Sequence, residues 1–199
     1  MKSSIGLVLA SRSPRRHAIL RFAGIPHRWV WPAGTPEKRK KGESPNRFVR
    51  RLAYEKALAV AKQKPDCWVL GADTVVVCRG ELMGKPHHPT GAQRMLLKLQ
   101  GQTHMVWTGV ALVCQKEKKA YRHVEGTQVV FGRIPDLELR KYVKTREPYD
   151  KAGGYAIQGI AGRWIQGWKG DFFNVMGLPL QWVVRTINRI STLQKGFNP

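Results

Sequence analysis

The chain has 199 residues, enough to form one large domain or a two-lobed one and to bury a core without disulfides or a structural metal. Its 35 Lys and Arg against 13 Asp and Glu give a formal net charge of +22, which indicates anionic partners. The three cysteines are widely spaced and form no C-x-x-C pattern, which argues against a disulfide framework or a zinc site and favours a reducing cytoplasm.

The basic residues are spread along the chain rather than gathered in one motif. No recognition helix and no aromatic RNA-binding sheet can be read beside them, so non-specific attraction to nucleic acid is expected as a side property and not as the function. The first ten residues hold one lysine and a short apolar run. We therefore expect no signal peptide and no association with a membrane.

The first structured stretch, residues 5–20, is predicted to contain a buried strand, a turn and the start of a helix. Its apolar run, residues 5–10, is too continuous for a half-exposed strand, so a strand covered on both faces is expected. Ser13 is the expected N-cap, with a side-chain oxygen that accepts a hydrogen bond from a backbone N–H one turn into the helix, and Pro14 fits the first helical position. The predicted helix runs from Pro14 to about Ala23.

The start of this helix carries two cations where the helix dipole disfavours them. Arg15 and Arg16 lie in the first turn, at the positive end of the dipole. With the hydroxyls of Ser11 and Ser13 and the exposed backbone N–H groups, they predict a phosphate-binding site. Two solvated arginines opening an ordinary surface helix are the alternative that the sequence leaves open.

A second helix is predicted from Pro45 to about Lys64, after a polar loop over residues 32–44. Lys56 falls inside its apolar stripe. The lysine either extends its side chain along the surface to water or reaches into an anion site.

A buried strand over residues 67–72 is expected to end at Asp73 and Thr74, before the apolar run resumes. A carboxylate in so apolar a stretch is costly unless it has a cation, a metal or several hydrogen-bond donors. Asp73 is therefore predicted to have such a partner, with a backbone-capping aspartate as the alternative. Lys85 follows on a constrained loop after the returning strand.

The remainder of the chain alternates strands and helices without an internal repeat, which predicts the mixed α/β class and a single domain with two lobes. Residues 147–162 are rich in glycine, which fits a backbone lying close against a ligand or tight packing at a sheet edge. The other expected elements are a helix at 90–99, strands at 105–114, 121–131 and 164–168, a helix at 135–144, a turn at 170–171 and a closing helix that ends near 190.

Seven motifs occur in order along nearly the whole chain and together resemble the Maf family of nucleoside triphosphate pyrophosphatases. They are LASRSPRR at 9–16, ESPNRFVRRLAYEKA at 43–57, GADTVV at 71–76, GKP at 84–86, TGVAL at 108–112, EPYDKAGGYAIQG at 147–159 and NVMGLPL at 174–180. The resemblance implies an elongated two-lobed fold similar to inosine triphosphate pyrophosphatase, with a central mixed sheet, flanking helices and a deep cleft. It also implies cleavage of a nucleoside triphosphate to the monophosphate and pyrophosphate with a divalent cation, Mg²⁺ or Mn²⁺.

The resemblance assigns roles to residues already singled out. Asp73 would be the general base for the attacking water and would also touch the metal. The family usually carries a second acidic residue before the ESP motif, and here Glu37 is the residue available as a metal ligand. The residues implied to hold the triphosphate are Ser11, Ser13, Arg16, Lys56 and Lys85.

Three further positions resemble the group of the family that acts on dTTP and UTP. That group carries Arg after the Ser-Pro pair, Thr after the catalytic Asp and Gln before the last Gly, which here are Arg15, Thr74 and Gln158. The implied function is cytoplasmic housecleaning of dTTP, UTP and modified pyrimidine nucleotides. The alternative is a catalytically weakened nucleotide- or nucleic-acid-binding protein linked to cell-division control, and a homodimer is left open.

Overall fold

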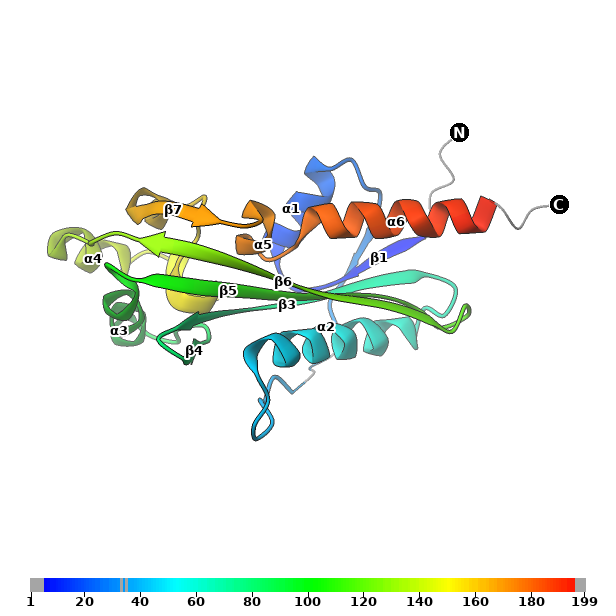
Figure 1. Ribbon diagram of the computed structural model, residues 1–199, viewed down its shortest axis with the longest axis horizontal. Helices are drawn as coiled ribbons and strands as arrows, with labels where there is room; N and C mark the ends of the chain where they lie inside the picture. The colour runs from blue at the N-terminus through cyan, green and yellow to red at the C-terminus, as the bar shows by residue number, and fades with distance from the viewer. Residues whose placement is uncertain (1–5, 33, 35, 196–199) are drawn as a thin grey trace. The chain divides into compact units, whose positions relative to one another are not determined.

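The computed structural model describes residues 6–32, 34 and 36–195, so the Ile5 end of the first predicted strand lies outside the described residues. Helices and strands alternate along the chain, which confirms the mixed α/β class (Figure 1). The first half contains β1 (Leu7–Ala10), α1 (Pro14–Phe22), β2 (Arg28–Val30), α2 (Pro45–Ala61), β3 (Trp68–Cys78), β4 (Glu81–Met83) and α3 (Pro89–Leu99). The second half contains β5 (Thr103–Cys114), β6 (Lys119–Phe131), α4 (Asp136–Tyr142), three 3₁₀ turns at Glu147–Asp150, Ala152–Gly154 and Ile160–Trp164, β7 (Ile165–Lys169), α5 (Phe172–Val175) and α6 (Leu180–Lys195).

Over the described residues, seven strands form one sheet in the order β2-β1-β3-β5-β6-β7, with β4 paired to β3. β1 pairs in parallel with both β2 and β3, and α1 and α2 make the connections between these strands. β4 and β7 pair antiparallel with β3 and β6. The sheet is therefore mixed. Within the described ranges, no helix is long and apolar enough to cross a membrane.

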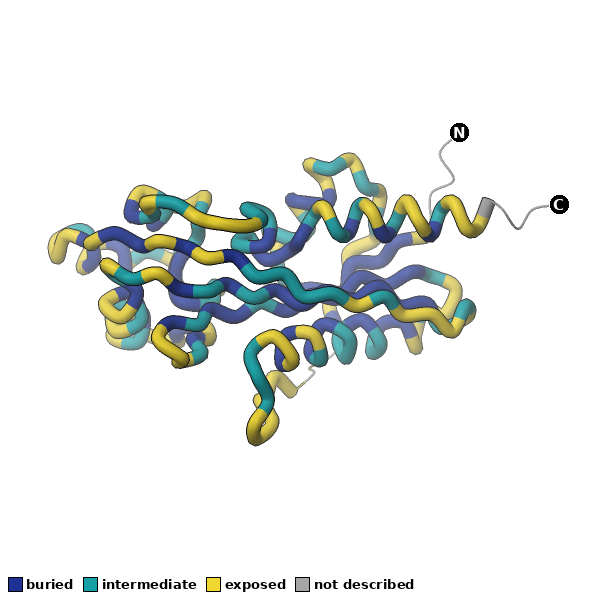
Figure 2. Tube along the Cα trace, in the orientation of Figure 1, coloured by how far each residue is buried: buried dark blue, intermediate teal, exposed yellow. Residues whose placement is uncertain are grey.

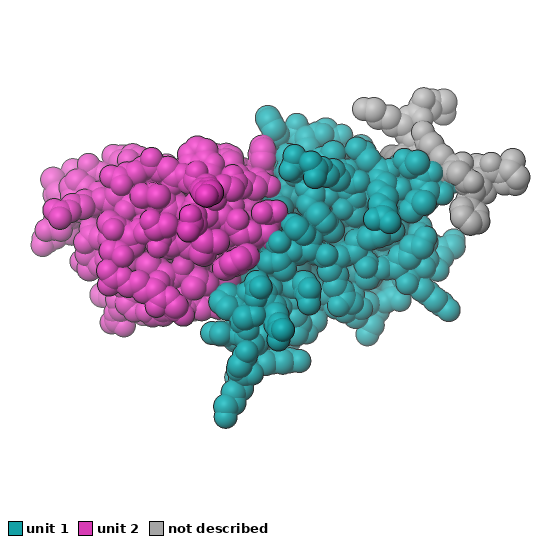
Figure 3. All heavy atoms as spheres, viewed as in Figure 1, with its two compact units in different colours: residues 1–73, 108–124, 177–199 teal, residues 74–107, 125–176 magenta. Residues whose placement is uncertain are grey.

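The chain divides into two compact units (Figure 3). Unit 1 comprises residues 1–73, 108–124 and 177–199, and unit 2 comprises residues 74–107 and 125–176. β3, β5 and β6 contribute residues to both units. The single domain expected from the sequence stays a prediction.

In unit 1, helices cover both faces of the sheet, as side chains of β6 show. The guanidinium of Arg122 lies 3.4 Å from the ring centroid of Tyr54 in α2, whereas the ring of the next residue, His123, stacks on Trp182 of α6. Because successive side chains of a strand point to opposite faces, α2 and α6 lie on opposite sides of the sheet (Figure 1).

The apolar side of α2 faces the sheet and its polar side faces outward (Figure 2). Its buried residues are Phe48, Val49, Leu52, Ala53, Ala57, Val60 and Ala61. Two glycines let the helix approach the strands closely: a Cβ on Gly71 of β3 would lie 2.3 Å from the carbonyl oxygen of Ala53, and one on Gly109 of β5 would lie 2.3 Å from that of Val49.

Unit 2 has its own apolar core. Aromatic rings are prominent in it: Phe131 and Tyr155 make an edge-to-face contact with centroids 5.2 Å apart, and Tyr142 and Trp164 make another at 5.1 Å. Other members are Val76, Cys78, Met83, Leu96, Leu99, Val106, Val129 and Leu139.

Three local predictions differ from the structure. The strand expected to stop before Asp73 continues to Cys78 as β3, because the side chain of Asp73 finds a charged partner and the flanking residues are apolar and buried. Ser13 has the backbone conformation of an N-cap, but the structure records no side-chain capping bond for it; instead its N–H donates to Oγ of Ser11 at 3.1 Å. At residues 170–171 the chain does bend at Gly170, as expected, but Asp171 is the N-cap of a short helix, α5, that was not expected, and its side chain accepts hydrogen bonds from two backbone N–H groups.

Candidate active site

Asp73 lies in the stretch of β3 that passes the carboxyl end of β1. The last residue of β1, Ala10, pairs with Gly71, so Asp73 is two residues beyond the end of the neighbouring strand. Its side chain is buried and accepts a hydrogen bond from Nζ of Lys56, with 2.5 Å between Nζ and Oδ1. The close approach of α2 at Gly71 brings Lys56 to this position.

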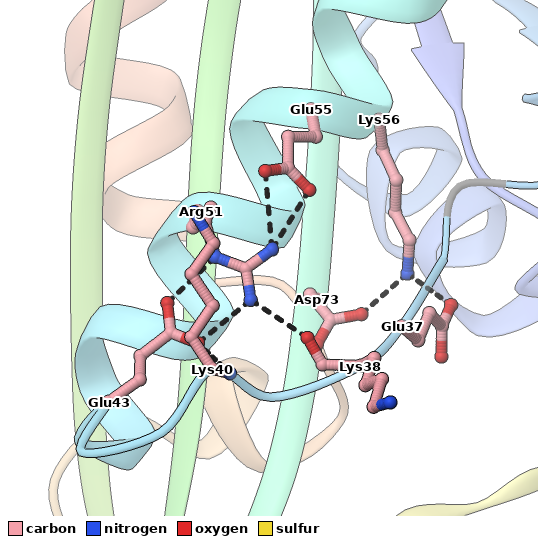
Figure 4. A network of polar contacts seen from close by, with 8 residues as sticks. All are labelled: Glu37, Lys38, Lys40, Glu43, Arg51, Glu55, Lys56 and Asp73. Atoms are coloured by element: carbon pink, nitrogen blue, oxygen red, sulfur yellow. Dashed lines mark hydrogen bonds and ion pairs between the residues drawn. The ribbon is translucent and has the colours of Figure 1, made fainter.

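The same ammonium group also contacts Glu37. Nζ of Lys56 lies 2.6 Å from Oε1 of Glu37, so two carboxylates converge on one positive charge (Figure 4). Glu37 is more exposed than Asp73: 56% of its side-chain surface is accessible, against 10% for Asp73. The structure thus unites three residues that the sequence had placed in a loop, a helix and a strand.

Burial shapes the acidity of Asp73. Loss of water around the carboxyl group raises its pKa above the ordinary value, and this outweighs the lowering by Lys56 and Arg16. The negative charge of Glu37 also raises the pKa of Asp73, but by less than burial does. Asp73 therefore holds a proton more readily than an ordinary aspartate, as a general base must.

Arg16 stabilises the turn after β1 through hydrogen bonds. Its Nε donates to the carbonyl of Gly177 at 2.7 Å, and one terminal nitrogen donates to the carbonyl of Ala72 at 2.9 Å and to Oγ of Ser11 at 3.2 Å. Burial lowers the pKa of Arg16 to about 10, so the group remains charged at neutral pH. The indole N–H of Trp29 also donates to the backbone carbonyl of Ser11, at 2.6 Å. These contacts fix the predicted phosphate-binding turn next to the strand that carries Asp73.

Three predicted site residues belong to unit 2. Thr74 follows Asp73 directly in β3, whereas Lys85 and Gln158 are exposed on loops. The Lys85 loop is bound to the glycine-rich segment, because the N–H of Gly153 donates to the carbonyl of Gly84 at 2.9 Å. The contacts of Thr74, Lys85 and Gln158 with substrate stay predictions.

The glycine-rich segment supports the packing alternative for two of its glycines. Gly153 and Gly154 are buried with positive φ angles of 72° and 73°. A Cβ on Gly153 would lie only 3.2 Å from the side chain of Val76, and one on Gly154 would lie 3.4 Å from that of Pro86. These glycines allow tight turns against neighbouring side chains. Contact of this segment with a ligand stays a prediction.

Glu147, which the sequence reasoning did not single out, fixes the segment just after Gln158. Its Oε2 accepts a hydrogen bond from the N–H of Ile160 at 2.8 Å, and its Oε1 accepts from the hydroxyl of Tyr142 at 3.1 Å. A side chain on Gly159 would collide with this carboxylate, since a Cβ would lie 2.3 Å from Oε1. The acidic start of the EPYD motif was the available signal.

Arg51 was missed as well. It binds Glu43 and Glu55, and its i,i+4 spacing to Glu55 on one helix face was readable in the sequence. Its contact with Glu43 was not readable, since that residue lies in a loop.

Asp73 and Glu37 could hold a divalent cation. The described residues contain no group of three or more His, Cys, Asp and Glu side chains placed to bind a metal. Asp73 and Glu37 nevertheless already lie on either side of one positive charge, that of Lys56. Carboxylate oxygens are the ligands that Mg²⁺ and Mn²⁺ prefer, and water would complete the coordination of the ion. The residues present therefore fit such an ion.

Comparison with known proteins agrees with the motifs. Curated proteins described as dTTP/UTP pyrophosphatase are similar to this chain: one from Syntrophus aciditrophicus is 44% identical over 94% of this chain and 91% of its own length. Those from Koribacter versatilis and Geobacter sp. (strain M21) are 45% and 46% identical, over 95% and 97% of this chain and 96% and 99% of their own.

A solved structure described as a HAM1 protein from Coxiella burnetii matches 96% of this chain and 99% of its own length at 12% identity. Its TM-score of 0.49 is too low to support a conclusion about the fold. The profile of the family described as "Maf-like protein" matches residues 6–190. With that match across nearly the whole chain and relatives above 40% identity, the chain belongs to the Maf family.

Proposed function

We propose that this protein hydrolyses dTTP and UTP to the monophosphate and pyrophosphate and so removes surplus or modified pyrimidine nucleotides from the nucleotide pool. The observation that carries the proposal is the buried carboxylate of Asp73, held beside Lys56 in a chain of the Maf family. The relatives named dTTP/UTP pyrophosphatase, at 44–46% identity, support the same substrates.

In the proposed reaction, water attacks the triphosphate and the bond between the α- and β-phosphates breaks. Asp73 orients the water and takes its proton on a carboxylate oxygen, and the electron pair of the broken bond leaves with pyrophosphate. Because the pKa of Asp73 is raised, its carboxylate is a stronger base than that of an ordinary aspartate.

Positive charge near the attacked phosphate stabilises the negative charge of the transition state. Lys56 supplies one ammonium at Asp73, and Arg16 holds Ser11 and the helix start in place. Lys85 and Ser13 are proposed to bind further phosphate oxygens. A Mg²⁺ or Mn²⁺ ion held by Asp73 and Glu37 would neutralise triphosphate charge and polarise a phosphoryl oxygen.

Arg15, Thr74 and Gln158 are the proposed determinants of base recognition. Together they offer guanidinium and amide donors, a hydroxyl and an amide acceptor, a set that suits the two carbonyls and the N–H of thymine or uracil. A cytoplasmic location and non-specific electrostatic attraction to nucleic acid are part of the proposal, and a homodimer is compatible with it.

The alternative, a catalytically weakened binding protein linked to cell division, finds no support. The loop before the ESP motif (residues 43–45) is basic rather than acidic, and this loss of acidic residues was the reason to consider weakened catalysis. Glu37, the acidic residue available there, nevertheless reaches the ammonium that binds Asp73.

The test is pyrophosphate release from dTTP, UTP, GTP and methylated GTP, each with Mg²⁺ and with Mn²⁺. The proposal expects dTTP and UTP to be hydrolysed well ahead of both guanine nucleotides. A preference for methylated GTP, or no release from any triphosphate, would overturn it.

A further inference from the structure

A basic loop, defined here as residues 38–43, connects Glu37 to the start of α2. Four consecutive cations in it, Lys38 to Lys41, repel one another, and all four are exposed. Such a segment has no apolar side chain to bury, so its shape depends on polar contacts. Glu37 precedes it directly, and the loop therefore decides where the Glu37 carboxylate can reach.

The far end of the basic loop is a closed turn. The N–H of Glu43 donates to the carbonyl of Lys40 at 3.1 Å, and the N–H of Lys40 donates back to Oε2 of Glu43 at 3.1 Å. Gly42 takes the left-handed conformation, with a φ of 72°, that this turn needs. The carboxylate of Glu43 is thus held at a fixed place.

Arg51 of α2 binds both ends of the basic loop with one guanidinium group (Figure 4). Its Nε and one terminal nitrogen donate to the two carboxylate oxygens of Glu43 at 2.7 and 2.8 Å. The latter nitrogen also donates to the backbone carbonyl of Lys38 at 3.0 Å. The other terminal nitrogen donates to both carboxylate oxygens of Glu55, at 3.1 and 3.2 Å.

This arrangement is well protected for a surface loop. The side chains of Arg51 and Glu43 are 19% and 10% exposed, and the pair is bidentate, the geometry in which an arginine–carboxylate contact is strongest. The hydrogen bonds from Arg51 are the main cause that lowers the pKa of Glu43 to about 2, so the pair stays ionised at neutral pH.

The contact with Lys38 links Arg51 to the candidate active site. Lys38 is the neighbour of Glu37 in the chain, and Lys56 lies five residues after Arg51 on the same helix, about 7.5 Å further along its axis. One rigid helix therefore sets the separation between the anchor of the basic loop and the ammonium that Glu37 contacts.

We propose that Arg51 is a positioning residue, which fixes the basic loop so that Glu37 lies beside Lys56 and Asp73, ready to complete a cation site. The part of this inference that concerns catalysis rests on the proposed function. The part that concerns the loop and cation binding does not.

The experiment compares the parent protein with Arg51→Met, Glu37→Gln and the double variant. Arg50→Met is the matched control, because Arg50 is the preceding residue of the same helix and is exposed. Three quantities are measured: kcat and KM for dTTP, binding of Mn²⁺ alone by electron paramagnetic resonance, and amide hydrogen exchange at Lys40 and Glu43.

In Arg51→Met, we expect Mn²⁺ affinity and kcat each to fall by about tenfold or more, as is usual when the support of a metal ligand is removed. KM for dTTP should change less. Exchange at the Lys40 and Glu43 amides should accelerate, while exchange in β1 stays slow. Arg50→Met should match the parent in all three measurements.

The double variant separates positioning from general stabilisation. If Arg51 acts through Glu37, Arg51→Met should cost less than about twofold in Mn²⁺ affinity once Glu37 is already Gln, because the two effects are not additive. Equal losses in both backgrounds, or unchanged exchange at Lys40 and Glu43, would overturn the proposal.

Two further arms keep the outcome clear. Glu43→Gln weakens the same pair from the loop side, and it replaces Arg51→Met in the cycle if that variant does not fold. If the parent releases no pyrophosphate, the proposed function fails, yet exchange and Mn²⁺ binding still decide whether Arg51 positions Glu37.

Discussion

Gly71 of β3 faces Ala53 of α2 so closely that a Cβ on Gly71 would lie 2.3 Å from the Ala53 carbonyl oxygen. Real Cβ atoms do not approach backbone this closely, so Gly71→Ala must push the helix off the strand. We expect a loss of about 1–3 kcal/mol in the free energy of unfolding, and reduced turnover because Lys56 moves away from Asp73.

Chemical denaturation and pyrophosphate release check this prediction. Gly167→Ala is the control, since a Cβ there has no atom within 4 Å and the change of residue is the same. If Gly71→Ala proves as stable and active as Gly167→Ala, the close approach does not position Lys56.

Lys56→Met removes the cation nearest to Asp73. The ammonium lowers the pKa of the buried carboxyl, so without it the carboxylate becomes harder to form and its pKa rises further. The acid limb of the kcat/KM profile should therefore move to higher pH, together with a loss of turnover. An acid limb at the parent's position would show that Asp73 does not set it.

His104 predicts how stability depends on pH. It is buried, 2% exposed, with its Nε2 2.7 Å from the hydroxyl of Tyr155, and burial lowers its pKa from 6.5 to about 4. The folded protein binds the proton less readily than the unfolded chain. The neutral ring therefore contributes stability that is fully present above pH 6.5 and is lost as the pH falls toward 4.

The difference between the pKa of 6.5 in the unfolded chain and about 4 in the folded protein lowers the free energy of unfolding by about 3 kcal/mol when the pH reaches 4. His104→Gln, which can still bind the Tyr155 hydroxyl, should flatten this part of the curve. The exposed His87→Gln should leave it intact. A curve that keeps the parent's slope in His104→Gln would exclude His104 as the cause.

Gln158→Glu tests base recognition. The change removes an amide donor and adds a negative charge, so a site that pairs with thymine or uracil is left with unpaired groups, at about 1–3 kcal/mol for each. We expect dTTP turnover to fall about tenfold or more while the melting temperature is unchanged, because Gln158 is exposed. Gln63→Glu, the same change at another exposed glutamine, is the control. Unchanged dTTP turnover would remove Gln158 from base recognition.

The sequence predicted the chemistry of the buried residues better than their geometry. Asp73 and Lys56 stood out because a charged side chain in an apolar pattern needs a partner, and each proved to be the other's partner. The length of β3 could not be predicted, since Asp disfavours strands and the cost of burying Asp73 is offset only by a residue on another element, Lys56 of α2.

Contacts made by loops and by backbone atoms were harder to foresee. Glu37 contacts Lys56 from a loop whose Lys38 carbonyl accepts a hydrogen bond from Arg51, thirteen positions away, and neither spacing nor hydrophobic pattern encodes such contacts. The sequence also does not reveal that α2 approaches β3 closely at Gly71, because a glycine in a strand is as compatible with a bulge as with a helix packed against it.

The most direct test of the account is kcat for dTTP in Asp73→Asn. The amide is nearly isosteric and Lys56 keeps Glu37 as a partner, so the variant should fold, but an amide cannot accept the proton of the attacking water. Asp66→Asn, at an exposed carboxylate paired with Lys116, serves as the control. We predict that turnover falls by about 10²–10⁴-fold in Asp73→Asn and stays at the parent's value in the control. Turnover within a few-fold of the parent in Asp73→Asn would contradict the role of Asp73 as the general base.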